Sequence, residues 1–328
     1  MENGKIINLM KSKILTIAGD ASFRTFYRLI HKKRGKIVVF AKKEKYKNLV
    51  VYSAINKFLR INKILTPKLY AHNYTKGMIV IEDFGDLSFY NVLTNKKNKF
   101  LIYKKLIDLL IKIQKIKPQS KLRNIINKSH IVNKYSNKYL HKESDLFFNW
   151  YLPSFLNKKI NKKIKIKAKK ILSKLYNKLN FSNSYFVHRD YHAQNLMKIG
   201  NKVGVIDSQD ALIGHPAYDL VSLVDDVRIK TSHKLKNQIC NYYLKKSKKI
   251  HKIKLKKFLE DFNILSVQRS LKIIGIFSRL FIRDKKKRYL KFIPYIWQLL
   301  EMRMDSEIFS ELKKILSSNI SRKLKKKL

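Results

Sequence analysis

The chain has 328 residues, enough for two lobes with separate hydrophobic cores, and a formal net charge of +52 that would attract polyanions. Cys240 is the only cysteine, so the composition excludes an internal disulfide and a zinc site built on cysteines. No stretch of the sequence approaches the roughly 18 uninterrupted apolar residues that a membrane-spanning helix needs.

The N-terminal segment, residues 1–20, has charges throughout and no apolar core leading to a small-residue cleavage site. We therefore expect no secretory signal and a cytoplasmic protein. After it, segments 22–30 and 36–42 have the apolar and aromatic character of strands, and a turn that contains Gly35 joins them.

The next segments complete a strand-rich beginning. A helix is expected at 49–62, because apolar residues recur there at three- and four-residue spacing. A second pair of strands surrounds a turn at Lys76 and Gly77, and residues 78–86 have the pattern of a buried strand that runs into a hinge. Beyond the hinge the pattern is helical, with predicted helices at 100–116, 157–180 and 268–284.

The most informative stretch is VHRDYHAQNLM at 187–197, followed by VGVIDSQD at 203–210. Asp190 and Asn195 stand five residues apart on a loop, and Asp207 closes a short strand seventeen residues after Asp190. This spacing repeats the H-R-D-x-x-x-x-N loop and the downstream metal-binding Asp of kinases. A polar loop between two ordinary strands is the alternative, but all three residues at these distances favour a catalytic hairpin.

The residue types suit phosphoryl transfer, which needs the acceptor hydroxyl held in line and the triphosphate charge neutralised by Mg²⁺. Asp190 can accept the hydroxyl proton, while Asn195 and Asp207 supply hard oxygen ligands for Mg²⁺. We therefore predict a two-lobed, kinase-like α+β fold with a nucleotide between the lobes. Residues 1–84 would form the strand-rich nucleotide-binding lobe, and residues 85–328 the helical lobe with the catalytic loop and acceptor site.

A turn that covers the phosphates is expected at the beginning of the strand-rich segment, where the sequence reads AGDASFRTFYR (18–28). Small residues let backbone N–H groups approach phosphate oxygens, although a surface hairpin is the alternative. A phosphate-pairing lysine is expected on the next strand, where Lys42 and Lys43 are the candidates. The helix at 49–62 contains no Glu that could form an ion pair with either lysine. The sequence therefore does not decide which lysine pairs with the phosphates.

Two histidines flank the catalytic aspartate. His188 and His192 are four residues apart, but no third soft ligand lies nearby, so we do not expect zinc. We expect His188 to brace the loop through a hydrogen bond and His192 to face the cleft.

Several acidic residues follow the hairpin. Asp219 is interpreted as a helix-capping or loop-bracing carboxylate. Three further residues could reach an acceptor site, with an exposed helix face as the alternative: Asp225, Asp226 and Arg228.

Together these residues resemble the aminoglycoside phosphotransferase-like small-molecule kinases, most closely the bacterial kinases of N-acetylmuramate and N-acetylglucosamine. The blocks that carry the resemblance are GDASFRTFYRL (19–29), HRDYHAQNLM (188–197), IDSQDALIGHPAYDLVSLVDDVR (206–228), QRSLKIIGIFSRL (268–280) and, more weakly, RYLKFIP (288–294). Two features depart from these kinases: Ser208 stands where they usually carry a bulky apolar residue, and the net charge is far above theirs.

The resemblance implies an ATP- and Mg²⁺-dependent enzyme that phosphorylates an amino sugar at its anomeric hydroxyl, in cell-wall recycling. Asp190 would be the catalytic base, with Asn195 and Asp207 as the Mg²⁺ ligands. The nucleotide would be held by the turn Gly19, Asp20, Ala21, Ser22 and Phe23, by Lys42, and by the backbone at Ile81–Phe84, which includes Glu82 and Asp83. On the acceptor side the candidates are His192, Arg228 and Arg269.

Other functions stay open. One is a kinase of another small alcohol, such as choline or an aminoglycoside, although a basic C-terminal half suits a polycation poorly. Another is a binding protein with a retired kinase fold, which the intact catalytic residues argue against. We expect no specific nucleic-acid partner, because Lys is spread from end to end and Lys, Ile and Asn share A/T-rich codons. Incidental, salt-dependent binding of polyanions is expected.

Overall fold

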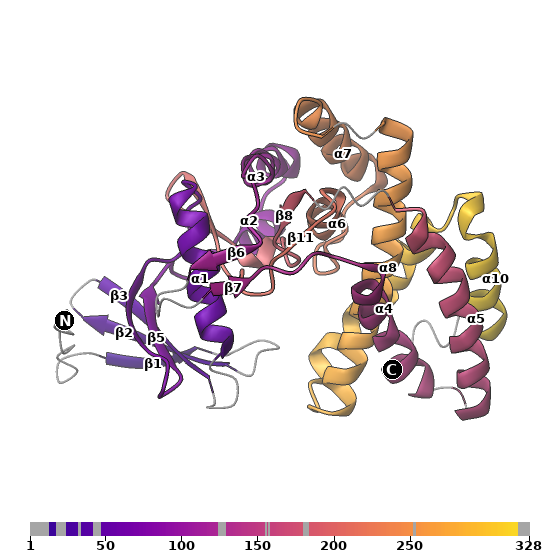
Figure 1. Cartoon of the computed structure of the whole chain (residues 1–328), viewed down its shortest axis with the longest axis horizontal. Coiled ribbons are helices and arrows are strands. Elements are labelled where there is room, and N and C mark those ends of the chain that lie inside the picture. The colour runs from indigo at the N-terminus through magenta and orange to yellow at the C-terminus, as the bar shows by residue number, and fades with distance from the viewer. Residues whose placement is uncertain are drawn as a thin grey trace. The chain divides into compact units, whose positions relative to one another are not determined.

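The computed structural model describes residues 13–17, 24–31, 34–41, 47–123, 129–154, 156, 158–179, 184–251 and 254–320. The chain divides into two compact units (Figure 1). The first unit comprises residues 1–133 and 188–212, and the second comprises residues 134–187 and 213–328. The predicted functional division of the chain at residue 84 remains a prediction.

The first unit contains an antiparallel sheet of five strands in the order β1-β2-β3-β5-β4. The predicted strands and the predicted helix near residue 50 are confirmed. The bounds are β1 Lys13–Ile17, β2 Arg24–His31, β3 Arg34–Ala41, α1 Lys47–Ile61, β4 Leu69–Asn73 and β5 Met78–Glu82.

The core of this sheet follows from strand alternation, because every second residue of a strand points to the same face. The buried cluster joins alternate residues of β3 and β5 to residues of α1. Its members include Ile37, Val39, Ala41, Ile79, Ile81, Leu49 and Tyr52. The predicted turn is present at Gly77, whose φ of 66° suits a residue without a Cβ. There Ala41 N–H donates to the Gly77 carbonyl at 2.8 Å.

The predicted catalytic hairpin is also in the first unit. It consists of a 3₁₀ turn, Ala193–Asn195, and the antiparallel strands β9, Leu196–Ile199, and β10, Lys202–Val205. Two backbone hydrogen bonds of 2.8 Å attach it to the preceding chain, from Lys198 N–H to the Leu87 carbonyl and from Val205 N–H to the Leu65 carbonyl. The unit is completed by α2 Phe89–Asn95, α3 Lys99–Gln114, β6 Lys121–Arg123 and β7 Ser129–Ile131.

The second unit is mainly helical. The predicted helix at 268–284 proves to be the C-terminal part of a longer helix, α8, which begins at Leu255. The other helices are α4 Asn137–Leu146, α5 Lys158–Asn177, α6 Ala217–Val224, α7 His233–Ser247, α9 Ile293–Arg303 and α10 Ser310–Asn319. Short elements are a π-helical turn Phe147–Tyr151, 3₁₀ turns Leu152–Ser154, Lys287–Phe292 and Glu307–Phe309, and strands β8 Tyr185–Val187 and β11 Leu212–Gly214.

Helix α8 is the centre of the second unit. At Gly275 it approaches the backbone of Leu146 and Phe147 so closely that a Cβ would overlap those atoms. The buried carboxylate of Glu143 in α4 accepts a hydrogen bond from Gln268 of α8 at 2.9 Å and pairs with Lys272 at 3.0 Å. A buried charge paired in this way fixes the helices against each other.

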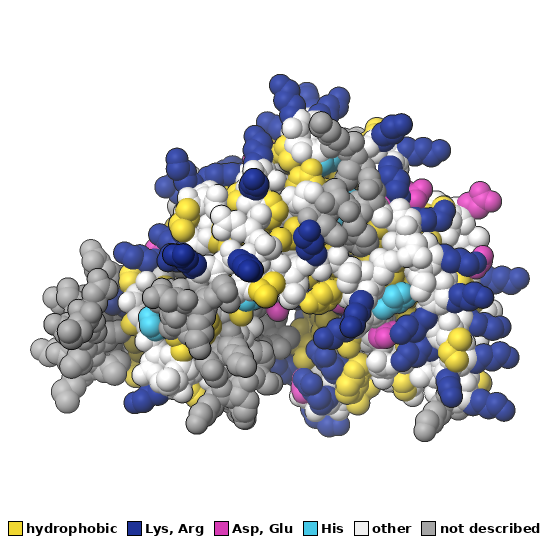
Figure 2. Space-filling model, viewed as in Figure 1, with side chains coloured by type: hydrophobic (Ala, Val, Ile, Leu, Met, Phe, Trp, Pro, Cys, Tyr) yellow, Lys and Arg dark blue, Asp and Glu magenta, His cyan; other side chains and the backbone are white. Residues whose placement is uncertain are grey.

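The surface is strongly basic. Figure 2 shows Lys and Arg side chains dispersed over the face in view rather than gathered in one patch. Among the helices of the described part of the chain, none has the length and apolar character that crossing a membrane requires.

A glycine lies where the hinge packs on the hairpin. A Cβ at Gly204 in β10 would lie 2.6 Å from Cε2 of Phe84. We expect Gly204→Ala to lower the free energy of unfolding by about 1–3 kcal/mol, because the added methyl overpacks this contact. Urea unfolding followed by far-UV circular dichroism measures the change. The double variant Gly204→Ala/Phe84→Leu should recover part of the loss, and a Gly204→Ala protein as stable as the parent would contradict the prediction.

Candidate active site

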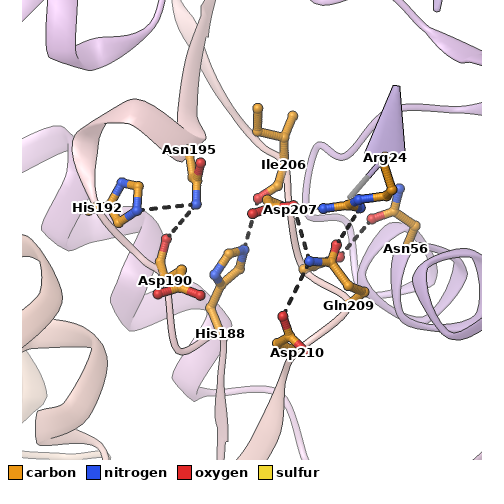
Figure 3. Close-up of polar contacts among 11 residues, drawn as sticks. Arg24, Asn56, His188, Asp190, His192, Asn195, Ile206, Asp207, Gln209 and Asp210 are labelled. Atoms are coloured by element: carbon orange, nitrogen blue, oxygen red, sulfur yellow. Dashed lines mark hydrogen bonds and ion pairs between the residues drawn. The ribbon is translucent and has the colours of Figure 1, made fainter. Parts of the chain in front are cut away.

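The loop between β8 and β9 is fixed by its histidine. His188 is almost fully buried, and its Nε2–H donates to the Ile206 carbonyl at 3.0 Å (Figure 3). The predicted bracing role of His188 is thereby confirmed. Arg189 follows with a φ of 75°, and its guanidinium donates to the Asp210 carbonyl at 3.2 Å. A left-handed backbone at a residue other than glycine is strained, and such strain persists where neighbouring contacts hold it.

Asp190 and Asn195 are joined by hydrogen bonds within the loop. The Asn195 amide donates from Nδ2 to the Asp190 backbone carbonyl at 3.0 Å, and His192 N–H donates to the same carbonyl at 2.9 Å. Because the amide nitrogen faces this carbonyl, the amide oxygen of Asn195 points away from it (Figure 3). The orientation presents an oxygen, the atom that a hard cation prefers.

Asp207 is brought beside this loop by the backbone. Ile206 N–H donates to the Asn195 carbonyl at 3.1 Å, so Asp207 follows directly on a residue bonded to Asn195. Asp207 itself has a φ of 64°, again in the left-handed region. Its Oδ1 accepts from Gln209 Nε2 at 3.1 Å and pairs with Arg24 Nη2 at 2.6 Å. The structure therefore brings together the three residues that the sequence motif singled out.

Ser208 has a partner that explains its polarity. Its Oγ donates to Oδ1 of Asn56 in α1 at 2.9 Å, and both side chains are buried. Close by on α1, burial raises the pKa of Tyr52, which therefore stays protonated. This polar pair attaches the Asp207 turn to α1.

The hinge carboxylates are engaged by the protein. Glu82 accepts a hydrogen bond from the Lys68 backbone N–H at 3.0 Å. Asp83 pairs with Arg28 at 2.6 Å, and Arg28 also reaches Asp86 at 2.8 Å. The hydrogen bond from Arg28 lowers the pKa of Asp86. These side chains brace the hinge, and the Glu82 backbone N–H is engaged as well, since it donates to the Lys68 carbonyl at 2.8 Å.

Other predicted site residues are placed differently. His192 is buried in the loop, with its Nε2 3.5 Å from the Asn195 amide nitrogen. Arg228 and Arg269 belong to the second unit, where Arg228 lies 3.8 Å from Asp226 and Arg269 is buried in α8. The turn at residues 19–23 and the lysines at 42 and 43 lie outside the described residues.

Asp219, Asp225 and Asp226 are buried, so an exposed helix face at Asp225 and Asp226 is wrong. Burial opposes the charged form of Asp225, but Lys236 and Arg303 hold its pKa well below the usual range. Both cations lie within 3.0 Å of its carboxylate. Asp219 lies in the first turn of α6, whose N-cap is Pro216, so it is not the N-cap residue; its loop-bracing role stays a prediction. Because α6 consists mainly of buried apolar residues, the acidic residues that follow it are buried too, and buried carboxylates need ion-pair or hydrogen-bond partners.

The donor set near Asp207 fits a magnesium ion. Within the described part of the chain, no three His, Cys, Asp or Glu side chains are grouped as metal ligands. Mg²⁺ bound to a nucleotide needs only one or two protein oxygens, because phosphates and water complete its shell. The Asn195 amide oxygen and the Asp207 carboxylate match that requirement.

Comparison with known families decides the class of protein. Residues 13–254, more than half of the chain, match the phosphotransferase enzyme family, APH. The chain belongs to this family. The resemblance inferred from the sequence blocks is thereby confirmed, and the protein is a phosphotransferase.

Two curated relatives are each named N-acetylmuramate/N-acetylglucosamine kinase. The one from Caulobacter vibrioides is 28% identical over 261 residues, covering 78% of this chain and 70% of its own. The one from Pseudomonas aeruginosa is 28% identical over 294 residues, covering 88% and 83%. Among solved structures, ADP-bound aminoglycoside phosphotransferase APH(2'')-Ib matches with a TM-score of 0.58 at 15% identity, covering 90% of this chain and 93% of that one. That likeness confirms the predicted two-lobed kinase-like fold.

The polar pair beneath Asp207 can be tested through stability. Ser208→Ala leaves the Asn56 acceptor buried without its donor, so we expect the free energy of unfolding to fall by about 1–3 kcal/mol. Urea denaturation measures the change, with Ser317→Ala, an exposed serine of α10, as the matched control. Equal stability of Ser208→Ala and Ser317→Ala would show that the buried hydroxyl is not needed.

Proposed function

We propose that this phosphotransferase is an ATP- and Mg²⁺-dependent kinase that phosphorylates the anomeric hydroxyl of N-acetylmuramate or N-acetylglucosamine. The observation that carries the proposal is the arrangement of Asp190, Asn195 and Asp207, held together by the bonds at Ile206 and His188. The shared name of the curated relatives supports the acceptor. The product, a sugar 1-phosphate, would enter nucleotide-sugar synthesis during cell-wall recycling in the cytoplasm.

Asp190 is the catalytic base of this proposal. Its carboxylate accepts the proton of the acceptor hydroxyl as the hydroxyl oxygen attacks the terminal phosphorus of ATP, and the bond from that phosphorus to the bridging oxygen breaks to release ADP. An anomeric hydroxyl is more acidic than an ordinary alcohol, so the reaction depends more on positioning than on the strength of the base. The rigid loop provides that positioning, since the Asp190 carbonyl is held by Asn195 and His192.

Asn195 and Asp207 hold Mg²⁺ in this proposal, and a bound Mg²⁺ would neutralise phosphate charge. The nucleotide itself is assigned to three segments of the chain. The turn at Gly19–Phe23 covers the phosphates, the backbone around Glu82 and Asp83 holds the adenine, and Lys42 is a candidate phosphate partner. Both hinge carboxylates are already engaged, by Lys68 and Arg28.

The acceptor side is assigned to His192, Arg228 and Arg269. A guanidinium presents paired N–H groups that match a carboxylate, which suits the lactyl group of N-acetylmuramate. A strongly basic protein also favours a neutral or anionic sugar over a polycation.

The base can be tested by an isosteric change. We expect Asp190→Asn to reduce kcat by about 10²–10⁴-fold, because the amide cannot accept the proton. Nucleotide affinity and the unfolding midpoint should stay close to the parent values. Asp305→Asn removes the same charge from a side chain that is 85% exposed and serves as the control. A variant at residue 190 that keeps most of its kcat would overturn the assignment of the base.

The acceptor can be tested with a panel of alcohols and ATP, read by ADP release and by phosphorus NMR of the product. We expect N-acetylmuramate and N-acetylglucosamine to react at C1, and their methyl glycosides, which lack the free anomeric hydroxyl, to be inert. Choline and an aminoglycoside complete the panel. Much faster turnover of either would refute the amino-sugar acceptor and leave the kinase assignment in place.

A further inference from the structure

Arg24 contacts Asp207 in the candidate site, although no sequence motif assigned it a role. It is the first residue of β2 and directly follows the turn expected to cover the phosphates. Its side chain is buried, and its Nη2 reaches Oδ1 of Asp207 at 2.6 Å. Its Nη1 donates to Oε1 of Gln209 at 3.1 Å, and Gln209 returns a bond to the same Asp207 oxygen (Figure 3). The three side chains form a closed triangle.

This triangle bears on the proposed metal site. Between described residues, the bonds to the Asp207 carboxylate engage Oδ1, while the side chain as a whole is 37% exposed. The carboxylate can therefore hold Arg24 and still offer Oδ2 to a cation. Asp207 also has a left-handed backbone, so a bond that fixes its side chain helps to keep the strained turn in place.

A kinase site needs a protein cation beside the phosphates, usually a lysine held by a glutamate of the neighbouring helix. Here α1, Lys47–Ile61, contains no acidic residue, so that ion pair cannot form on it. The described cation that does reach the metal-binding carboxylate is Arg24, which approaches it from β2 rather than β3. A guanidinium offers a planar set of N–H donors that can bind a carboxylate and a phosphate together.

We propose that Arg24 supplies a cation that pairs with the terminal phosphates of the bound nucleotide, and that without nucleotide it serves as the counter-ion of Asp207. The inference rests on the proposed function, since it assumes that a nucleotide binds at Asp207. Arg24 is then a binding residue of the site and also a positioning residue for Asp207. An ion pair that is structural alone would stabilise the fold without affecting nucleotide affinity.

The test compares Arg24→Gln and Arg24→Lys with the parent by calorimetric titration of ADP in the presence of Mg²⁺. We expect Arg24→Gln to weaken ADP binding by about tenfold to a hundredfold, the usual effect of losing a hydrogen bond to a charged group. Arg24→Lys keeps the positive charge but loses the planar set of N–H donors, so it should bind ADP more tightly than Arg24→Gln and less tightly than the parent. Lys13→Gln, which removes an exposed charge from β1 of the same sheet, is the matched control and should bind ADP like the parent.

A double-variant cycle with Asp207→Asn separates the two parts of the proposal. Without nucleotide and Mg²⁺, Arg24→Gln should lower the melting temperature of the parent but have a smaller effect when Asp207 is already Asn. Folded Arg24→Gln and Arg24→Lys proteins with parental ADP affinity would overturn the proposal, whatever their melting temperatures. If Arg24→Gln does not fold, reduced ADP affinity of folded Arg24→Lys supports the proposal and parental affinity overturns it. Failure of the parent protein to bind ADP would instead refute the proposed function.

Discussion

The candidate site depends on how the loop at Asp190 is fastened to the turn at Asp207. Two bonds to Ile206 do this, one from the His188 ring to its carbonyl and one from its own N–H to Asn195. Since both reach the residue immediately before Asp207, they set the position of the carboxylate relative to the loop. They also hold Arg189 and Asp207 in left-handed backbone conformations that would otherwise relax.

Acidic residues are few in this basic protein, and several of them form buried ion pairs. Of 96 charged side chains, 74 are Lys or Arg and 22 are Asp or Glu, so each carboxylate has many potential partners. Several carboxylates lie inside a unit and are paired there: Glu143 with Lys272, Asp225 with Lys236 and Arg303, and Asp261 with Lys257 and His215. Removing one partner of such a pair leaves an uncompensated buried charge, which destabilises strongly. The buried carboxylates thus hold the surrounding helices through ion pairs, while lysines without such a buried partner remain in solvent.

Carboxylates of the candidate site are also held by basic side chains. Asp207 is more exposed than the core carboxylates, yet it is held by Arg24 and Gln209. The hinge acid Asp83 is held by Arg28, which lies four residues after Arg24 on the same face of β2. One strand therefore carries arginines to both the hinge and the turn at Asp207. The four-residue spacing of Arg24 and Arg28 places both side chains for these two contacts.

The sequence pattern was enough to predict β2 to β5, the hinge, the hairpin and the spacing of Asp190, Asn195 and Asp207, because alternation, turn chemistry and motif spacing are local properties. It also determined the bracing role of His188. Only the tertiary structure decided what long-range contacts control: the pairing of Arg24 with Asp207, the match of Ser208 to Asn56, and the burial of Asp225. Each of these features joins residues that are far apart in the chain, or buries a polar residue. A local sequence pattern does not identify a partner that comes from a distant segment. For that reason the sequence left an exposed helix face open at Asp225, whose cationic partners come from α7 and α9.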